Sequence, residues 1–225
     1  MEYEPRNVLI LGVPFAGKTY LAGFAAAHVS RDLVVIVHTY ADPSYLEHIP
    51  RSRTRFVEAT SKGYTVTRKL LEETRQGANE RYKHYLYVIV KDLSPEEVQR
   101  FLDRLSQAVM ETQNLALFLD DASVFCSQLS LFEKKYQAFH RLVRGSRHFG
   151  IDLTLVTHRV YDIPPTIRCT LNQLVLFRVI ESSDLDVLAR HLDLGSRAER
   201  LATLPNRQFL LVDRTHDSVA GPYTL

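Results

Sequence analysis

The sequence predicts an α/β fold in which a mainly parallel central sheet is covered by helices on both faces. Two observations lead to this prediction. Short apolar runs of strand length alternate with amphipathic stretches along the chain, which is the order of a strand–helix–strand fold. Several runs, such as Leu33–His38 and Tyr85–Val90, are nearly continuous in Val, Leu, Ile and Tyr. Such runs are typical of strands that are buried on both faces.

The apolar runs and the amphipathic stretches give the expected elements in chain order. The expected strands are Val8–Leu11, Leu33–His38, Arg55–Glu58, Tyr85–Val90, Leu115–Leu119, Leu153–Thr157, Leu174–Arg178 and Gln208–Asp213. The expected helices are Lys18–Ser30, Thr65–Gln76, Pro95–Thr112, Leu131–Arg147, Ser183–Leu192 and Arg197–Thr203. No repeat or long linker interrupts this order, so residues 1–225 are expected to form a single domain.

Composition narrows the class of protein. The 225 residues are 45% hydrophobic and 24% charged, a globular balance that excludes a disordered chain. A net charge of +2 gives no basis for inferring a nucleic-acid partner from charge alone. Cys126 and Cys169 form no metal-ligand pair, which fits a reducing setting. The acidic start with Pro5 is not a signal peptide, and the apolar runs are shorter than the ~20 residues of a membrane span. We therefore expect a soluble intracellular protein without its own membrane anchor.

The strongest motif is G-V-P-F-A-G-K-T at residues 12–19, which fits the P-loop pattern G-x-x-x-x-G-K-[ST]. Gly12 and Gly17 allow a tight turn that aims backbone N–H groups at phosphate oxygens, and the following helix adds its positive end. Lys18 is expected to reach the β- and γ-phosphates and Thr19 to ligate Mg²⁺. A chance match is the alternative, which the preceding strand and following helix disfavour. The predicted nucleotide-binding residues are Gly12, Val13, Pro14, Phe15, Ala16, Gly17, Lys18, Thr19 and Tyr20.

A second motif is the apolar run Leu115–Leu119 followed by Asp120 and Asp121. Acids after such a strand lie at the carboxyl edge of the sheet, where the P-loop also lies. The pair is expected to be a Walker B motif, with Asp120 holding the metal and Asp121 polarising the attacking water. A polar turn with helix-capping residues is the alternative. Together the two motifs predict a RecA-like P-loop NTPase domain that binds ATP and Mg²⁺ and hydrolyses ATP.

The region after the Walker B strand resembles a specific family. It reads R-G-S-R-H-F-G-I-D-L-T-L-V-T-H-R at 144–159, D-I-P-P-T-I-R at 162–168 and L-V-L-F-R-V at 174–179, followed by S-S-D-L at 182–185 and P-N-R-Q-F-L-L-V at 205–212. This resembles the HerA–FtsK superfamily of DNA-pumping ATPases. The resemblance covers most of the chain. It is strong from Leu115 to Val212 but is little more than element order between Tyr40 and Thr112.

The resemblance implies an oligomeric motor that moves double-stranded DNA without reading its sequence. The small single-domain members include genome-packaging ATPases of double-stranded DNA viruses with an internal membrane. The absence of a transmembrane region and a winged helix favours that branch over a septal translocase or a repair helicase. The implied partners are double-stranded DNA, further copies in a homo-oligomeric ring, and capsid or membrane vertex proteins. The implied location is the host cytoplasm or the virion vertex.

Two positions depart from the family pattern. His158 stands where the family strand usually ends in Gln, which contacts the γ-phosphate or the attacking water. An imidazole can form similar hydrogen bonds but titrates near neutrality, so a sensor role and an ordinary surface histidine both stay open. Asp121 stands where Glu is often found and is one methylene shorter.

The resemblance also places an arginine just before the Gly-Ile-x-Leu strand, and Arg147 matches that position best. Ring ATPases often take a cation for the γ-phosphate from the neighbouring subunit. Arg144 and Arg168 are the other candidates for this arginine finger. By helical phase, Arg147 lies beside the apolar face of the Leu131–Arg147 helix. The strand after this helix should lie between the P-loop strand and the Walker B strand. Ordinary salt bridges are the alternative for all three arginines.

Two basic clusters are candidate DNA contacts. Lys134, Arg141, Arg144 and His148 fall within about a quarter of the helix circumference, although charge stripes are often only solvated. Arg51, Arg53 and Arg55 follow Pro50 in an expected loop. A translocating motor should contact the DNA backbone rather than base edges, and a solubilising surface is the alternative.

Two other classes of protein stay open. A small nucleotide or metabolite kinase would need a lid for its acceptor, for which Arg75, Arg81 and Lys83 are available, but it leaves the tandem acids unexplained. A nucleotide-gated assembly or export factor of the filamentous-phage type is expected to carry a transmembrane segment. ATP turnover without an acceptor separates the kinase from the motor.

Overall fold

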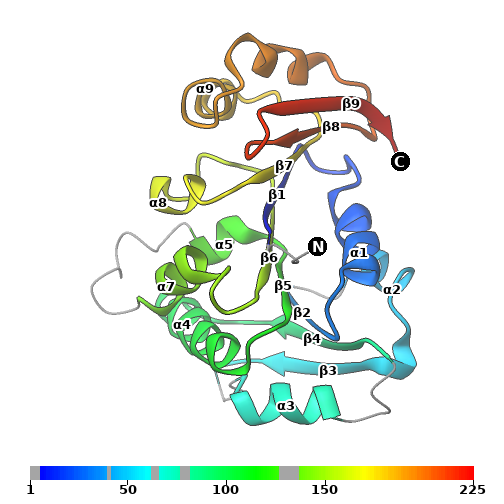
Figure 1. Cartoon of the computed structure of the whole chain (residues 1–225), viewed down its shortest axis with the longest axis vertical. Coiled ribbons are helices and arrows are strands. Elements are labelled where there is room, and N and C mark those ends of the chain that lie inside the picture. The colour runs from blue at the N-terminus through cyan, green and yellow to red at the C-terminus, as the bar shows by residue number, and fades with distance from the viewer. Residues whose placement is uncertain (1–5, 40–41, 62–65, 77–81, 127–136) are drawn as a thin grey trace.

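The computed structural model describes residues 6–39, 42–61, 66–76, 82–126 and 137–225. These residues form one nine-stranded sheet with the order β3-β4-β2-β5-β6-β1-β7-β8-β9 (Figure 1). Strands β1 to β7 pair in parallel, and β8 and β9 are antiparallel to their neighbours. The strands are β1 (Asn7–Leu11), β2 (Leu33–His38), β3 (Thr54–Ala59), β4 (His84–Val90), β5 (Ala116–Leu119), β6 (Asp152–Thr157), β7 (Gln173–Leu176), β8 (Gln208–Asp213) and β9 (Ser218–Thr224).

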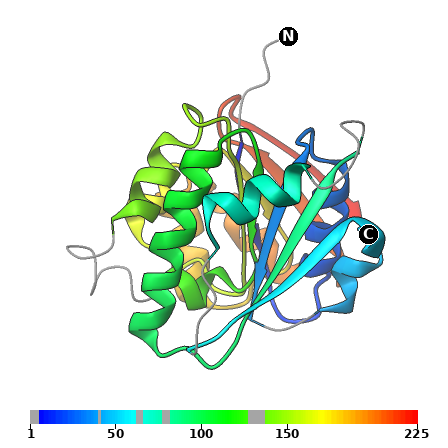
Figure 2. The ribbon, with the colours of Figure 1, turned by 90° about the horizontal axis from the view of Figure 1, so that it is seen from below.

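Helices cover both faces of the sheet (Figure 2). Helices α1 and α2 pack on one face, and α3, α4, α5 and α7 pack on the other. The helices are α1 (Lys18–His28), α2 (Pro43–Leu46), α3 (Arg68–Gln76), α4 (Pro95–Thr112), α5 (Ala122–Cys126), α7 (Ala138–Gly145), α8 (Pro165–Arg168) and α9 (Ser182–His191), with 3-10 helices η1 (Arg51–Arg53) and η2 (Gly195–Thr203). Within the described residues, no helix is both long and apolar enough to span a bilayer.

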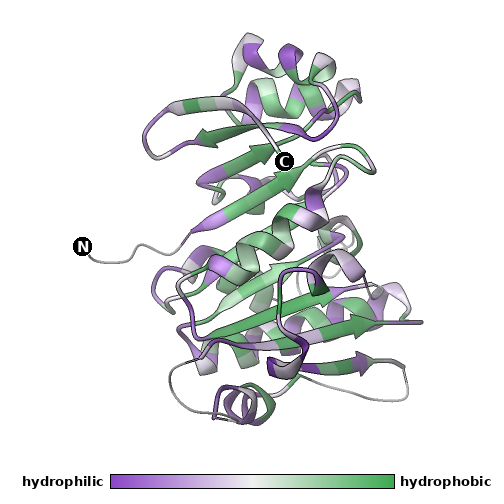
Figure 3. Ribbon diagram, turned by 90° about the vertical axis from the view of Figure 1, so that its right-hand side faces the viewer, coloured by the Kyte–Doolittle hydropathy of each residue, from purple (hydrophilic) through white to green (hydrophobic). Residues whose placement is uncertain are grey.

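Alternation along the strands explains the two layers. In β2, Val35 and Val37 belong to the core under α3 and α4, whereas Val34 and Ile36 belong to the core under α1 and α2. Successive side chains of a strand point to opposite faces, so a strand that is apolar throughout needs helices on both sides. Figure 3 shows the resulting concentration of apolar residues along the central strands.

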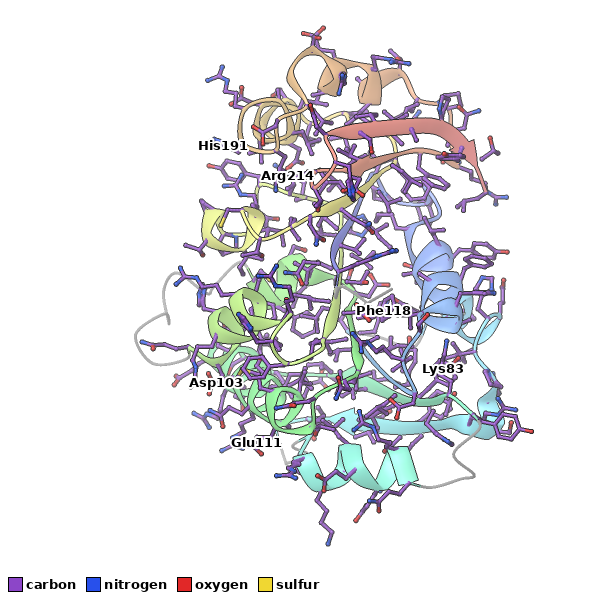
Figure 4. All side chains as sticks on the ribbon, in the orientation of Figure 1. Lys83, Asp103, Glu111, Phe118, His191 and Arg214 are labelled. Carbon is purple, nitrogen blue, oxygen red and sulfur yellow. The ribbon has the colours of Figure 1, made fainter. Side chains whose placement is uncertain are left out.

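The start of the longest helix, α4, is fixed by residues of its own sequence. The Ser94 hydroxyl accepts a hydrogen bond from the Glu97 N–H at 3.4 Å, and the Glu97 carboxylate accepts one from the Ser94 N–H at 2.9 Å. This capping box satisfies N–H groups at the start of α4. Further along, Asp103 of α4 accepts a hydrogen bond from Ala138 N at 2.8 Å, which fixes the start of α7 against α4 (Figure 4).

The structure confirms the predicted fold class, and it places β6 between the P-loop strand β1 and the Walker B strand β5 as expected. It corrects the helix expected at Leu131–Arg147. The described helix is Ala138–Gly145, residues 127–136 lie outside the described residues, and Arg147 lies in the turn that follows. The chain turns there because Ile151 N bonds back to Ser146 O at 2.8 Å. Arg147 is therefore exposed and not beside the apolar face.

Smaller differences have local causes. Residues 195–203 form a 3-10 helix rather than an α-helix. Strand β9 was not expected, because it is exposed along its whole length and contains Gly221 and Pro222, so it carries no apolar run. The four-residue helix α2 and the five-residue helix α5 are too short to give a periodic pattern.

Candidate functional site at the carboxyl edge of the sheet

The predicted motifs meet at the carboxyl edge of the sheet. The P-loop follows β1, His158 follows β6, and Asp120 and Asp121 follow β5. The next strand in the sheet, β2, ends at His38 and is followed by Thr39. In α/β sheets with parallel strands, ligands bind in the crevice outside these strand ends.

The P-loop is pressed against the end of β7. A Cβ added at Gly12 would lie 2.5 Å from the Cβ of Phe177, which is too close for any side chain. Val13 N donates to Arg178 O at 2.9 Å and ties the loop to the same segment. Gly17 has a φ of 100°, in the region that favours glycine. Both glycines of the motif are therefore required by local geometry.

Lys18 is held inside this loop. Its side chain donates to Val13 O at 2.9 Å and lies 2.9 Å from His158 Nδ1, and the residue is 5% exposed. Burial lowers the pKa of Lys18 to about 8, while the nearby carboxylates Asp120 and Asp121 act in the opposite direction. The ammonium is therefore still mostly protonated at neutral pH and supplies a cation at the loop.

His158 lies between Lys18 and Asp121. Its Nε2 lies 3.9 Å from Asp121 Oδ1, on the side of the ring opposite Lys18. Burial, followed by the charge of Lys18, lowers the pKa of His158, although Asp121 opposes this shift. A neutral imidazole can accept a hydrogen bond from the lysine at Nδ1 and donate one from Nε2. The structure thus places His158 between Lys18 and Asp121.

The two acids differ in their surroundings. Asp120 is 3% exposed, its Oδ1 accepts from Asp121 N at 2.9 Å, and its Oδ2 lies 3.3 Å from His38 Nε2. Asp121 has a φ of 56°, and its Oδ2 accepts a hydrogen bond from Thr39 Oγ1 at 2.5 Å. Burial and the nearby Asp120 raise the pKa of Tyr45, which packs edge-on to His38. Asp121 is thus oriented by Thr39, which follows β2, and Asp120 is the more buried of the two acids.

The donor set fits Mg²⁺. Asp120 supplies a carboxylate that acts on the charge of Lys18, and its buried Oδ2 lies 3.3 Å from His38 Nε2. Thr19 lies beside Lys18 at the start of α1 and supplies a hydroxyl. Mg²⁺ prefers hydroxyl and carboxylate oxygens, and it is usually bound through one or two carboxylates together with substrate phosphates.

A cavity of about 730 Å³ is lined by Lys18, Thr19, Asp121 and His158, whereas the buried Asp120 does not line it. This volume is in the range of small-molecule sites. Its wall from the P-loop consists of Pro14, Phe15, Gly17, Lys18, Thr19 and Tyr20. Of the other predicted nucleotide-binding residues, Gly12 and Val13 form the base of the loop, and Ala16 is buried at 1% exposure. Phe15 is 95% exposed, so its side chain faces solvent.

The chain matches no known protein-family model and no curated protein. Three solved structures of similar architecture are informative. The genome packaging NTPase B204 of Sulfolobus turreted icosahedral virus 2 has a TM-score of 0.68 at 21% identity, over 100% of this chain and 98% of that one. The DNA-packaging ATPase B204 of Sulfolobus turreted icosahedral virus has a TM-score of 0.67 at 21% identity, over 99% and 100%. VirB4 of Thermoanaerobacter pseudethanolicus has a TM-score of 0.66 at 11% identity, over 97% and 90%.

The chain shares the fold of the B204 packaging NTPases. B204 from the second virus has also been solved with ATP-gammaS and with AMPPCP. The match extends over nearly the whole of both chains, so it includes the stretch from Tyr40 to Thr112, where the sequence resembled the HerA–FtsK superfamily in little more than element order.

Within this B204-like fold, several residues of the cavity were missed by the sequence reasoning. His38 and Thr39 contact the acids, while Arg207 and Leu225 line the cavity from the last two strands. Residues of α2 and its two ends complete the wall: Asp42, Ser44 and Glu47. The sequence signal for Arg207 was its place in the Pro-Asn-Arg segment before β8. Nothing local indicated the others, because their contacts depend on strand order and on the return of the last hairpin.

The three candidate finger arginines lie away from the cavity of their own chain. Arg144 and Arg147 are exposed near the start of β6, at the edge opposite the P-loop. Arg168 is only 8% exposed, and burial lowers its pKa. An exposed arginine can enter a neighbouring copy, whereas Arg168 would first have to leave its buried position.

The candidate DNA contacts are partly engaged within the chain. Arg51 and Arg53 lie in η1, and the guanidinium of Arg53 lies 4.0 Å from the ring centroid of Tyr82. Arg55 lies in β3, as the expected strand Arg55–Glu58 predicts and not in the loop expected for the basic cluster, and it pairs with Glu73 at 3.3 Å.

The remaining candidates come from the predicted basic stripe. Arg141 is exposed on α7, and His148 is exposed in the turn after it. Lys134 lies outside the described residues.

Replacing Thr39 with valine is expected to lower kcat by about tenfold to a hundredfold, while KM and nucleotide affinity stay unchanged. Valine keeps the shape of the side chain but removes the hydroxyl that holds Asp121 Oδ2. Loss of orientation at a catalytic group lowers the rate without weakening substrate binding. Steady-state ATPase kinetics measure the split, and Thr39→Ser, which keeps the donor, should retain most of the rate. Equal rates for the wild type and Thr39→Val would remove this role.

Proposed function

We propose that the protein is an ATP-hydrolysing motor that moves double-stranded DNA, and that it packages a viral genome. The observation that carries the proposal is the convergence of Lys18, His158 and Asp121 beneath a P-loop. The convergence supplies a phosphate-binding cation and a carboxylate in one cavity. The shared fold with two viral packaging proteins supports the choice of DNA as the cargo.

In the proposed reaction, a water molecule attacks the γ-phosphorus of ATP and ADP leaves. Asp121 orients this water and accepts its proton, because its Oδ1 is not the oxygen held by Thr39. Lys18 and the P-loop N–H groups stabilise the charge on the β- and γ-phosphates. The position of His158 between Lys18 and Asp121 supports a role in sensing the terminal phosphate.

Thr19 and Asp120 are the residues that would hold Mg²⁺. When bound, the ion neutralises charge on the β- and γ-phosphate oxygens. Asp120 is fixed by its hydrogen bond from Asp121 N and by its contact with His38. The proposed metal ligand and the proposed base are therefore adjacent residues that share the contact with His38, and Thr39 additionally holds Asp121.

The decisive test is ATP turnover of the purified protein with and without double-stranded DNA. We expect turnover without any phosphate acceptor and a rise in rate when DNA of any sequence is added. Turnover only with a small-molecule acceptor would identify a kinase. Turnover that DNA of several lengths leaves unchanged would instead favour a nucleotide-gated assembly factor.

Binding of DNA is expected to weaken steeply with salt, because neutralising phosphates releases counterions. Replacing Arg51, Arg53 and Arg55 together with alanine should reduce the slope of log affinity against log salt concentration. The expected reduction is about one unit for each arginine that contacts a phosphate. Fluorescence anisotropy between low and moderate salt measures the slope. An unchanged slope would assign the three residues to the solvated surface, where Arg53 contacts Tyr82 and Arg55 pairs with Glu73.

The proposed ring takes an arginine from the neighbouring subunit, and Arg147 is the first candidate. Arg147→Ala alone and Lys18→Ala alone should each be inactive. A mixture should recover part of the turnover, at interfaces that pair an intact P-loop with an intact arginine. Normal turnover by Arg147→Ala, or turnover that is independent of protein concentration down to the monomer, would contradict the arrangement. Arg144→Ala tests the neighbouring candidate in the same assay.

A further inference from the structure

The walls of the cavity at the P-loop differ in their chemistry. Its reacting groups gather where Lys18 Nζ lies 2.9 Å from His158 Nδ1 and His158 Nε2 lies 3.9 Å from Asp121 Oδ1. A nucleotide carries its base at the opposite end from its terminal phosphate. A base held by the protein must therefore contact a different part of the wall, which offers α2 and its two ends on one side and the β8–β9 hairpin on another.

The wall from α2 is polar and acidic. It presents Asp42, Ser44 and Glu47, and the Asp42 carboxylate already accepts a hydrogen bond from Ser44 N at 2.8 Å. Carboxylates and hydroxyls suit sugar hydroxyls better than the flat apolar face of a base. This wall is the poorer match for the base.

The wall from the hairpin is held firmly against the P-loop. Leu225 N donates to Arg207 O at 3.1 Å, which joins the two residues across the hairpin. The Leu225 side chain lies directly on the loop, because a Cβ added at Gly17 would be 2.4 Å from Leu225 Cδ1. Figures 1 and 3 show the end of β9 beside the β1–α1 loop.

Ring packing fixes the rest of the hairpin. The Phe177 and Phe209 ring centroids are 5.2 Å apart, and those of Phe209 and Tyr223 are 5.7 Å apart. Phe177 follows β7, Phe209 belongs to β8 and Tyr223 belongs to β9, so the rings link three neighbouring segments. The hairpin therefore carries Arg207 and Leu225 as parts of a packed unit.

We propose that Arg207 and Leu225 form the subsite that holds the base of the nucleotide. The inference rests on the proposed ATPase function and adds a recognition element that comes from the last two strands. Tyr20 also lines the cavity, but its ring packs edge-on to His48 with the centroids 4.4 Å apart, so it belongs to the wall beside α2. A planar guanidinium and an aliphatic side chain are groups that can pack on the face of a base.

The subsite divides the binding energy of the nucleotide between two parts of the chain. The P-loop takes the phosphates, and the hairpin takes the base. Removing a hairpin side chain should therefore weaken a ligand that has a base and leave a ligand without one unaffected. If Arg207 instead contacted a phosphate, its removal would weaken the binding of both ligands alike.

The test compares ATP with inorganic tripolyphosphate, both with Mg²⁺, by isothermal titration calorimetry. Arg207→Ala is expected to weaken ATP binding by about tenfold, the scale of one lost stacking contact. Its affinity for tripolyphosphate should stay within about twofold of the wild type. Arg207→Lys keeps the charge but not the plane, so its affinity for ATP should be close to that of Arg207→Ala. Leu225→Ala tests the second side chain in the same way.

The matched control is Arg200→Ala, which removes an exposed arginine of η2 and should leave both affinities unchanged. Equal losses for ATP and tripolyphosphate, or rescue by Arg207→Lys, would overturn the proposal and make Arg207 a phosphate contact. Unchanged ATP binding by both hairpin variants would also overturn it. A wild-type protein that binds ATP no more tightly than tripolyphosphate has no base subsite but keeps its phosphate site. A wild-type protein that binds neither ligand would refute the proposed function and the subsite together.

Discussion

Replacing Lys18 with alanine is expected to abolish ATP turnover, with kcat at least a thousandfold lower, and to weaken ATP binding sharply. The ammonium is buried at the P-loop, 2.9 Å from both Val13 O and His158 Nδ1. Removal of one preorganised donor to a developing negative charge costs about a hundredfold to a thousandfold in rate. Lys18 also carries a full charge opposite the phosphates. Radiolabelled ATP hydrolysis and calorimetric binding measure the two effects.

The matched control for this change is Lys83→Ala. Lys83 is a second partly buried lysine, which donates to the carbonyl of Ala27 at 2.6 Å, and burial lowers its pKa as well (Figure 4). It lies outside the cavity, so its loss should affect stability and leave turnover unchanged. If Lys18→Ala still hydrolysed ATP at a tenth of the wild-type rate, the P-loop would not be the catalytic site.

Replacing Asp121 with asparagine is expected to stop turnover while ATP stays bound. Asparagine has nearly the same shape and can still accept from Thr39 through its carbonyl oxygen. It cannot take a proton from water, and the loss of a general base costs about a hundredfold to ten-thousandfold in rate. The dissociation constant for ATP should stay near the wild-type value, because Lys18 and Asp120 remain. Single-turnover kinetics and nucleotide binding separate the two outcomes.

Asp92→Asn is the matched control for Asp121→Asn. Asp92 also has a positive φ, 54°, and is exposed outside the cavity. It tests whether exchanging a carboxylate for an amide in a left-handed backbone matters by itself. Normal turnover by Asp121→Asn would show that Asp121 is not the base, and Asp120 would then need the same test.

The sheet could be predicted well because its strands carry their own signal. The run at Leu33–His38 is apolar throughout, and the structure gives β2 the same bounds. The bounds of β8 also agree with those predicted. The order of β5, β6 and β1 followed from the family resemblance. Strand β9 could not be found in this way, since its exposed residues gain their conformation from pairing with β8.

The site could be predicted only where residues are adjacent in sequence. The P-loop and the two acids are local motifs, and the structure brings P-loop residues and Asp121 to one cavity, with Asp120 hydrogen-bonded to Asp121. Thr39 reaches Asp121 because β2 lies next to β5. The order of strands in the sheet is a property of the tertiary structure, and a threonine at the end of a strand does not predict which strand lies beside it.

The contact between Gly17 and Leu225 joins two segments that lie far apart along the chain. Contacts of such large sequence separation form late, because the entropy of closing the intervening chain must be overcome first. A folding intermediate with a formed P-loop but an undocked hairpin would lack one wall of the cavity. The ability to bind a complete nucleotide should therefore be gained in the last steps of folding. By linkage, ATP would then stabilise the fully docked state over such intermediates.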